Sequence, residues 1–274
     1  MKRTTLLMGN SSGFTLIEMV MVIIITGIVA ATVSVLIRRP VEGYMNLSRR
    51  AELVDAADSA LRMMARDIRA ALPNSIRVSG GTALEMINTV DGGRYRIGPP
   101  GNASNRLEFN KADTDFDVMG GLNHIVAYSG TGLRIAIYNL GVTSADAYAG
   151  NVITPAGTTV NISSTGSDSH VQLTPGFQFA YESPRQRLYV VDGPISYFCD
   201  TATGSLLRND GYAIGAVQPA TPAGTPVTRH LTGCSITYLP GSSTRAALVT
   251  VALTLSASGE SINLLRQVHV ENIP

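Results

Sequence analysis

The sequence has no tryptophan, only two cysteines and only two lysines among its 274 residues. Two cysteines cannot build a disulfide-rich scaffold or a four-thiolate metal site. Charged residues make up 15% of the chain, below the usual quarter. The 21 basic and 20 acidic side chains leave a formal charge of +1. The chain therefore has no large net positive charge that would attract nucleic acid. With 45% hydrophobic residues, the composition also excludes a disordered chain.

The apolar residues are concentrated in one long run, and the chain has no second run of this kind. Residues 14–37 carry no charge except Glu18. A helix of this length is roughly 36 Å long, which is enough to cross the apolar core of a bilayer. The sequence therefore predicts a single-anchor chain with a substantial soluble part.

Three interpretations compete for this N-terminal region. A secretory signal would explain the basic start at Lys2 and Arg3, and Val29-Ala30-Ala31 could mimic a cleavage site, but the apolar run is too long. A plain membrane anchor fits the length. It leaves Glu18 unexplained, because a carboxylate at membrane depth costs a few kcal/mol and usually has a partner or a function.

The third interpretation depends on the junction Gly13-Phe14-Thr15-Leu16-Ile17-Glu18. This junction resembles the recognition motif of type IV prepilins and pseudopilins. The resemblance implies that a membrane prepilin peptidase cuts after Gly13 and methylates the new amine of Phe14. It also implies that Glu18 pairs with an N-terminal amine, in its own or a neighbouring subunit, during assembly. Cleavage would place an ammonium at Phe14 within one helical turn of Glu18.

The resemblance and the hydrophobic pattern together predict the organisation of the chain. A leader that begins at either Met1 or Met8 is followed by two helical segments and a globular domain. The expected boundaries are 1–13 for the leader, 14–39 for the hydrophobic helix, 40–75 for the amphipathic helix and 76–274 for the β-rich domain. Pro40 is expected to kink or interrupt the helix.

The second helical segment has an apolar stripe that predicts packing on a sheet. Residues at seven-residue spacing form the stripe, and a second set of apolar side chains fills the face between them. The first set is Leu47, Val54, Leu61 and Ile68, and the second is Ala57, Met64 and Ala71. Asp58 and Arg62 are spaced for an i,i+4 pair on the solvated face.

From residue 76 onward, short alternating runs predict strands. The predicted strands are 106–109, 124–128, 133–138, 177–181, 187–191, 195–198, 235–239, 246–256 and 262–270. Turns are predicted at 92–93, 99–102 and 192–194, and loops at 163–169 and 215–226. The last two strands are predicted to form a hairpin through residues 257–260. The fold class is therefore α+β, with a long N-terminal helix packed on an antiparallel β-rich domain.

Few residues suggest chemistry. In an exported domain Cys199 and Cys234 are expected to form a disulfide, with two free buried thiols as the alternative. Asp113, Asp115 and Asp117 resemble the start of a calcium loop, but the sixth position lacks glycine and the twelfth lacks glutamate, so a solvated turn is expected. The four histidines show no metal-binding spacing. We expect no enzyme activity, no cofactor and no metal.

Beyond the anchor, the chain resembles the larger minor pilins and the J-type minor pseudopilins, and residues 66–78 resemble minor pilins of mannose-sensitive haemagglutinin pili. The resemblance implies a subunit at or near a pilus tip, held in the inner membrane with its C-terminal domain in the periplasm and later extracellular. Expected partners are prepilin peptidase and other minor and major pilins, with no nucleic acid. The nearest alternative is a minor pseudopilin of a type II secretion system, and the neighbouring genes would distinguish it from a pilin. A pilus-borne adhesin is a further alternative.

Overall fold

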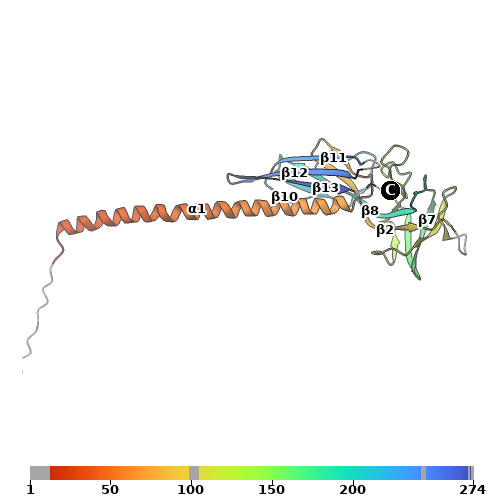
Figure 1. Ribbon diagram of the computed structural model, residues 1–274, viewed down its shortest axis with the longest axis horizontal. Coiled ribbons are helices and arrows are strands. Elements are labelled where there is room, and N and C mark those ends of the chain that lie inside the picture. Colours follow the sequence, from red (N-terminus) through yellow and green to blue (C-terminus); the bar gives the residue numbers. More distant parts are fainter. Residues whose placement is uncertain (1–12, 99–104, 242–244, 271, 273–274) are drawn as a thin grey trace, which may run out of the picture. The chain divides into compact units, whose positions relative to one another are not determined.

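The computed structural model describes residues 13–98, 105–241, 245–270 and 272. It divides into two compact units, Met1–Ala51 and Glu52–Pro274. One helix, α1 (Leu16–Arg69), begins in the first unit and ends in the second, and only strands follow it among the regular elements of the described residues (Figure 1). The expected α+β class, with a long N-terminal helix and an antiparallel β-rich domain, is confirmed.

The strands form two antiparallel sheets, one of ten strands and one of three. In the larger sheet the order is β10-β9-β8-β2-β3-β7-β6-β4, with β1 paired to β2 and β5 paired to β8, and in the smaller it is β11-β12-β13. The strands are β1 (Arg77–Ser79), β2 (Ala83–Tyr95), β3 (Asp113–Met119), β4 (Tyr128–Gly130), β5 (Arg134–Ala136), β6 (Thr159–Thr165), β7 (Asp168–Phe177), β8 (Arg187–Asp200), β9 (Ser205–Asn209), β10 (Thr225–Arg229), β11 (Leu231–Leu239), β12 (Ala247–Ala257) and β13 (Glu260–Val270).

The last turns of α1 supply one side of a core shared by both sheets. The helix residues in this core follow the 3.6-residue period of a straight helix. They are Leu53, Ala57, Ala60, Leu61, Met64, Ala65 and Ile68. The same core takes side chains from β2, β8 and β9 of the larger sheet and from all three strands of the smaller one. Figure 1 shows β11, β12 and β13 running along this part of the helix.

The predicted stripe is confirmed in its C-terminal part, where Ala57, Met64 and Ala71 are also buried, but it is wrong at its start. Leu61 and Ile68 are buried, but Leu47 is 68% exposed and Val54 is 39% exposed. A straight helix drifts by about 20° per heptad, so a seven-residue repeat leaves the buried face over several turns. Leu53 occupies the place in the core that the heptad pattern assigned to Val54.

The predicted interruption at Pro40 is wrong, because α1 continues through this residue. A proline inside a helix removes one N–H donor, so the carbonyl of Leu36 loses its usual partner. A helix of 54 residues has hydrogen bonds on both sides of such a defect and can continue past it.

Two predicted turns lie inside long strands. Residues 92–93 belong to β2, and Gly93 permits close packing rather than a turn, since a Cβ there would lie 2.4 Å from the side chain of Val118. Residues 192–194 belong to β8, where Gly193 has a φ of 141° opposite a register shift in β2. A bulge of this kind accommodates the missing N–H of Pro194.

Other local predictions were also wrong. Residues 106–109 form no strand, β7 ends at Phe177, and only Tyr128 of residues 124–128 is in a strand. Leu107 and Phe179 instead fill a core as parts of loops, with exposed fractions of 4% and 0%. Residues 163–169, predicted as a loop, are the ends of β6 and β7 around a tight turn at Gly166. The predicted turn at 99–102 lies outside the described residues.

The C-terminal hairpin is confirmed. β12 and β13 pair from Ala247 opposite Val270 to Ala257 opposite Glu260. Ser258 and Gly259 connect them with φ values of 52° and 87°. Two consecutive positive φ values are the signature of a type I′ hairpin turn, whose twist matches that of the strands.

A buried polar cluster fastens the end of α1 to the larger sheet. The hydroxyl of Tyr197 on β8 donates to Asp67 Oδ2 over 2.7 Å, and Arg208 Nε on β9 donates to the same oxygen over 2.9 Å. Tyr197 is fully buried, and burial together with the neighbouring Asp67 raises its pKa. Asp67 is therefore a buried charge that depends on both partners.

Replacing Tyr197 with phenylalanine should lower the free energy of unfolding of the domain by about 1.5–3 kcal/mol, because one hydrogen bond to a buried charge is lost. The change is measured by denaturant unfolding of the full chain in detergent micelles. Tyr181→Phe is the matched control, since its ring is 40% exposed, and should change stability by less than about 0.5 kcal/mol. Equal small effects of the two substitutions would contradict the role of the cluster.

Candidate functional site

The junction that the sequence singled out lies at the start of α1. Gly13 and Phe14 are exposed and precede the helix, which begins at Leu16. The peptide bond between them is thus outside the helical hydrogen-bond ladder, and a Cβ on Gly13 would meet no atom within 4 Å. A protease could reach an exposed, non-helical bond of this kind.

Glu18 occupies a specific place in the first turn of the helix. Its N–H donates to Thr15 Oγ1 over 3.3 Å, so Thr15 caps the helix and Glu18 is the third helical residue. Thr15 and Glu18 have the spacing of a capping box, a signal that the sequence analysis missed. A carboxylate in this first turn interacts favourably with the positive end of the helix dipole.

The apolar segment that follows has its other polar groups satisfied internally. Thr26 Oγ1 donates to the carbonyl of Val22 over 2.6 Å, and Ser34 Oγ donates to that of Ala30 over 2.7 Å. Thr32 makes the same kind of bond one turn back. Among the described residues, the Glu18 carboxylate forms no hydrogen bond or ion pair. It is thus the one charged side chain of residues 14–37, and it has no partner among them.

The large side chains of this segment are exposed, including Leu16 at 84% and Ile23 at 68%. A continuous apolar surface of this size is normally buried in a membrane or against other proteins. Among the described residues, α1 is the one helix long and apolar enough to cross a membrane. The predicted anchor is thus present as a helix.

The three aspartates at 113–117 do not form the solvated turn expected from the sequence, because they lie in strand β3. Asp113 is buried, and burial raises its pKa, although its carboxylate accepts a hydrogen bond from the backbone N–H of Glu108. Asp115 and Asp117 instead contact His170 on β7, the strand that pairs with β3.

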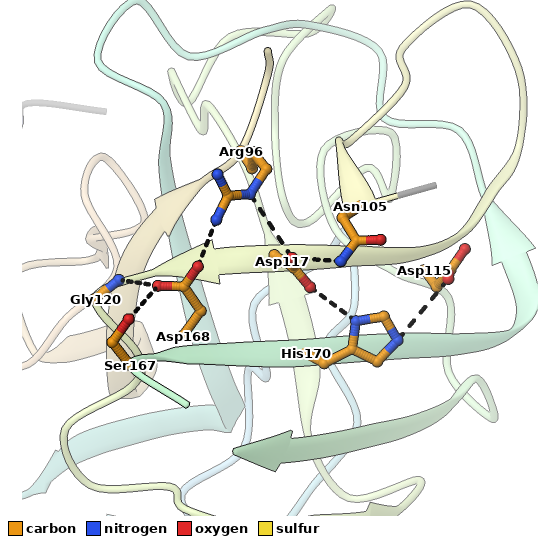
Figure 2. Close-up of polar contacts among 8 residues, drawn as sticks. All are labelled: Arg96, Asn105, Asp115, Asp117, Gly120, Ser167, Asp168 and His170. Carbon is orange, nitrogen blue, oxygen red and sulfur yellow. Dashed lines mark hydrogen bonds and ion pairs between the residues drawn. The ribbon is translucent and has the colours of Figure 1, made fainter. Parts of the chain in front are cut away.

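Figure 2 shows this polar network across β3 and β7. His170 Nδ1 lies 2.9 Å from Asp117 Oδ1, and His170 Nε2 lies 3.8 Å from Asp115 Oδ2. Asn105 Nδ2 donates to Asp117 Oδ2 over 2.7 Å, and Arg96 pairs with both Asp117 and Asp168. Sequence spacing could not reveal this network, because Asp117 and His170 meet only through the strand register.

Each carboxylate of the network already has a protein partner. Asp168 accepts a hydrogen bond from the N–H of Gly120 over 3.0 Å, and this bond, together with the charge of Arg96, lowers the pKa of Asp168. In the part of the chain that the structure describes, no group of three or more His, Cys, Asp or Glu side chains is arranged to hold a metal ion. The network therefore acts as a cross-strand brace.

Cys199 and Cys234 form a disulfide with their Cα atoms 6.1 Å apart. Cys199 lies in β8 of the larger sheet, and Cys234 lies in β11 of the smaller sheet. The bond thus joins the two sheets, and the strand predicted at 235–239 extends back to include Cys234. It is a covalent cross-link between two sheets that also share a core.

The comparisons with known proteins bear on the N-terminal junction alone. The family profile of the prokaryotic N-terminal methylation motif matches residues 8–34, which include Gly13, Phe14 and Glu18. No curated protein and no solved structure matches the chain. The motif indicates a type IV pilin-like protein and implies processing by prepilin peptidase and assembly with pilins. Together with the apolar helix, it suggests membrane anchoring before assembly.

Replacing Cys199 with serine should lower the free energy of unfolding of the β domain by roughly 2–5 kcal/mol, because the unfolded chain regains the freedom that the bond removes. The expected cut after Gly13 should be unaffected, since it depends on the N-terminal segment alone. Thermal unfolding measures the first effect and gel mobility the second. The double variant Cys199→Ser/Cys234→Ser is the control and should match the single one. Two titratable thiols in the purified, unreduced protein would contradict the disulfide.

Proposed function

We propose that this protein is a minor pilin of a type IV pilus of the mannose-sensitive haemagglutinin (MSHA) kind. It would be cut after Gly13, methylated at Phe14 and incorporated at or near the pilus tip, where it initiates or supports assembly. The function is mechanical rather than catalytic. The observation that carries the proposal is an exposed apolar helix whose one carboxylate, Glu18, has no partner among the described residues and lies within the matched methylation motif.

The geometry of the junction supports processing at this point. The bond between Gly13 and Phe14 is exposed and not helical, so it can enter a peptidase site without unwinding α1. Cleavage there would create an ammonium at Phe14. Because Glu18 is in the first turn of the helix, its carboxylate is close in the sequence to that new charge.

The charge of Glu18 supports a role in assembly. An unpaired carboxylate at membrane depth costs roughly 2.5–3.5 kcal/mol, and a neighbouring ammonium removes much of that cost. The amine of an adjacent subunit can provide this charge only at one axial position. Pairing would therefore fix the register between subunits while the rest of the helix provides apolar contact.

The exposed side chains of the helix supply the remaining energy of assembly. In the bilayer they contact lipid, and in a helix bundle they would contact the same kind of surface on other subunits. Transfer between two apolar surroundings involves little hydrophobic gain, so packing and the ion pair decide the outcome. This balance suits a subunit that must leave the membrane and enter a filament.

The finer assignment to a minor pilin depends on the segment 66–78, which resembles the minor pilin MshO. In this chain the segment contains Asp67 of the buried cluster with Tyr197, so it carries a structural role. A minor pseudopilin of a type II secretion system shares the anchor and a β-rich domain and is the second candidate. A pilus-borne adhesin is the third.

Replacing Glu18 with glutamine should leave cleavage intact and reduce incorporation into sheared pili by about tenfold or more. The reason is that a partner's ammonium would lose its counter-charge in an apolar bundle. The measurement is the ratio of this chain in the pilus fraction to that in the membrane fraction, by immunoblot.

Glu42→Gln is the matched control, because Glu42 is exposed on the same helix but lies outside residues 14–37. It should be incorporated like the unmodified chain. Equal incorporation of the Glu18 and Glu42 variants would contradict the role of Glu18, and absence of the chain from pili altogether would contradict the pilus assignment.

A further inference from the structure

A positively charged stretch of α1 follows directly after the apolar run, at residues 38–50. It contains arginines at positions 38, 39, 49 and 50 and one acidic residue, Glu42. Exposed apolar side chains such as Leu47 lie between them, together with Tyr44, which is 74% exposed. A helix surface that mixes arginine, tyrosine and apolar side chains suits neither water nor hydrocarbon and is typical of a membrane interface.

The charges of this stretch are not engaged within the chain. Among the residues that the structure describes, Arg38, Arg49 and Arg50 form no ion pair. Arg38 and Glu42 have the i,i+4 spacing of a pair, but no such pair forms between them. The stretch therefore presents a net positive charge to an external partner.

The position of the stretch along the helix matches the thickness of a bilayer. With a rise of about 1.5 Å per residue, Arg38 lies about 33 Å and Tyr44 about 42 Å from Leu16, where α1 begins. A bilayer has an apolar core about 30 Å thick and measures about 40–45 Å with its headgroups. When the start of the helix lies near one surface, residues 38–44 lie in the headgroup layer of the other. This layer is continuous with the surroundings of the apolar segment.

The chemistry of Arg38 selects among lipid headgroups. A guanidinium donates two parallel hydrogen bonds to phosphate oxygens, while its aliphatic stem lies along apolar surface. A zwitterionic lipid balances its phosphate with a cationic group, whereas an anionic lipid keeps a net negative charge. One arginine close to the membrane surface therefore favours an anionic lipid by about fivefold.

We propose that residues 38–44 of α1 bind the headgroup of an anionic phospholipid. Arg38 would hold the phosphate, and Tyr44 would lie beside it in the headgroup layer. The bound lipid would fix the depth of the anchor at this end, because Arg38 could leave the layer only by losing its counter-charge. The proposal shares with the proposed function a helix α1 that spans a membrane, and it depends on neither processing nor assembly.

The test is tryptophan fluorescence of the full chain reconstituted in vesicles. The chain has no tryptophan, so Tyr44→Trp introduces a single reporter in the stretch. The vesicles consist of phosphatidylcholine with a constant fraction that carries a spin label on its headgroup, and this label should quench the reporter. Phosphatidylglycerol in place of unlabelled phosphatidylcholine should relieve the quenching. The expected preference is about fivefold or more, and added salt should reduce it.

Arg38→Gln, made in the Tyr44→Trp chain, should reduce the preference for phosphatidylglycerol by about fivefold, because the charge at the headgroup is lost. Arg50→Gln is the matched control, since Arg50 is an exposed arginine of the same helix. It lies about 18 Å beyond Arg38, which is about twice the distance over which physiological salt screens a charge. The Arg50 variant should keep the full preference.

Three outcomes overturn the proposal. The first is no quenching by the headgroup label, since residues 38–44 would then lie outside the headgroup layer. The second is equal relief by both lipids, or an equal effect of the Arg38 and Arg50 substitutions. The third is relief that grows with the ratio of chain to lipid and ignores phosphatidylglycerol, because another copy of the chain would then cover the arginines. The vesicles contain no peptidase and no other pilin, so these outcomes leave the proposed function untouched.

Discussion

The structure depends on one constraint: the apolar surface of residues 14–37 must stay out of water while carrying one carboxylate. The backbone of the helix is hydrogen-bonded internally except at its ends and at Pro40, and its hydroxyl side chains bond to carbonyls one turn back. Glu18 cannot be satisfied in that way, and under the proposed function its partner would be the amine of Phe14, in its own or a neighbouring subunit. The missing partner of the Glu18 carboxylate is therefore the feature on which the proposed assembly between chains depends.

The β domain is attached to the C-terminal part of the same helix by packing and by buried polar contacts. Small side chains such as Ala57 and Ala65 let α1 approach both sheets closely, and Asp67 fixes the end of the helix to β8 and β9. The disulfide from Cys199 to Cys234 then joins the sheets to each other. The helix end thus cannot move independently of the sheets that it packs on.

Features set by local chemistry could be predicted from the sequence, namely the apolar helix, the α+β class and the C-terminal hairpin. Features set by distant partners could not. Gly93 indicated a turn by itself but is required by the close approach of Val118, and Asp117 meets His170 only through strand register. Glycines and aspartates therefore gave the least reliable predictions, since the same residue serves a turn, a bulge or a buried pair.

Mass spectrometry of the N-terminal peptide of this chain, isolated from membrane and pilus fractions, decides whether the junction is processed as in a prepilin. We expect a mature chain that begins at Phe14 with a methylated amine, and an uncut chain when Gly13 is replaced with valine. Gly27→Val, in the same helix, should be processed normally. A mature chain that begins after Ala31, as a secretory signal would give, or an uncut wild-type chain, would contradict this expectation.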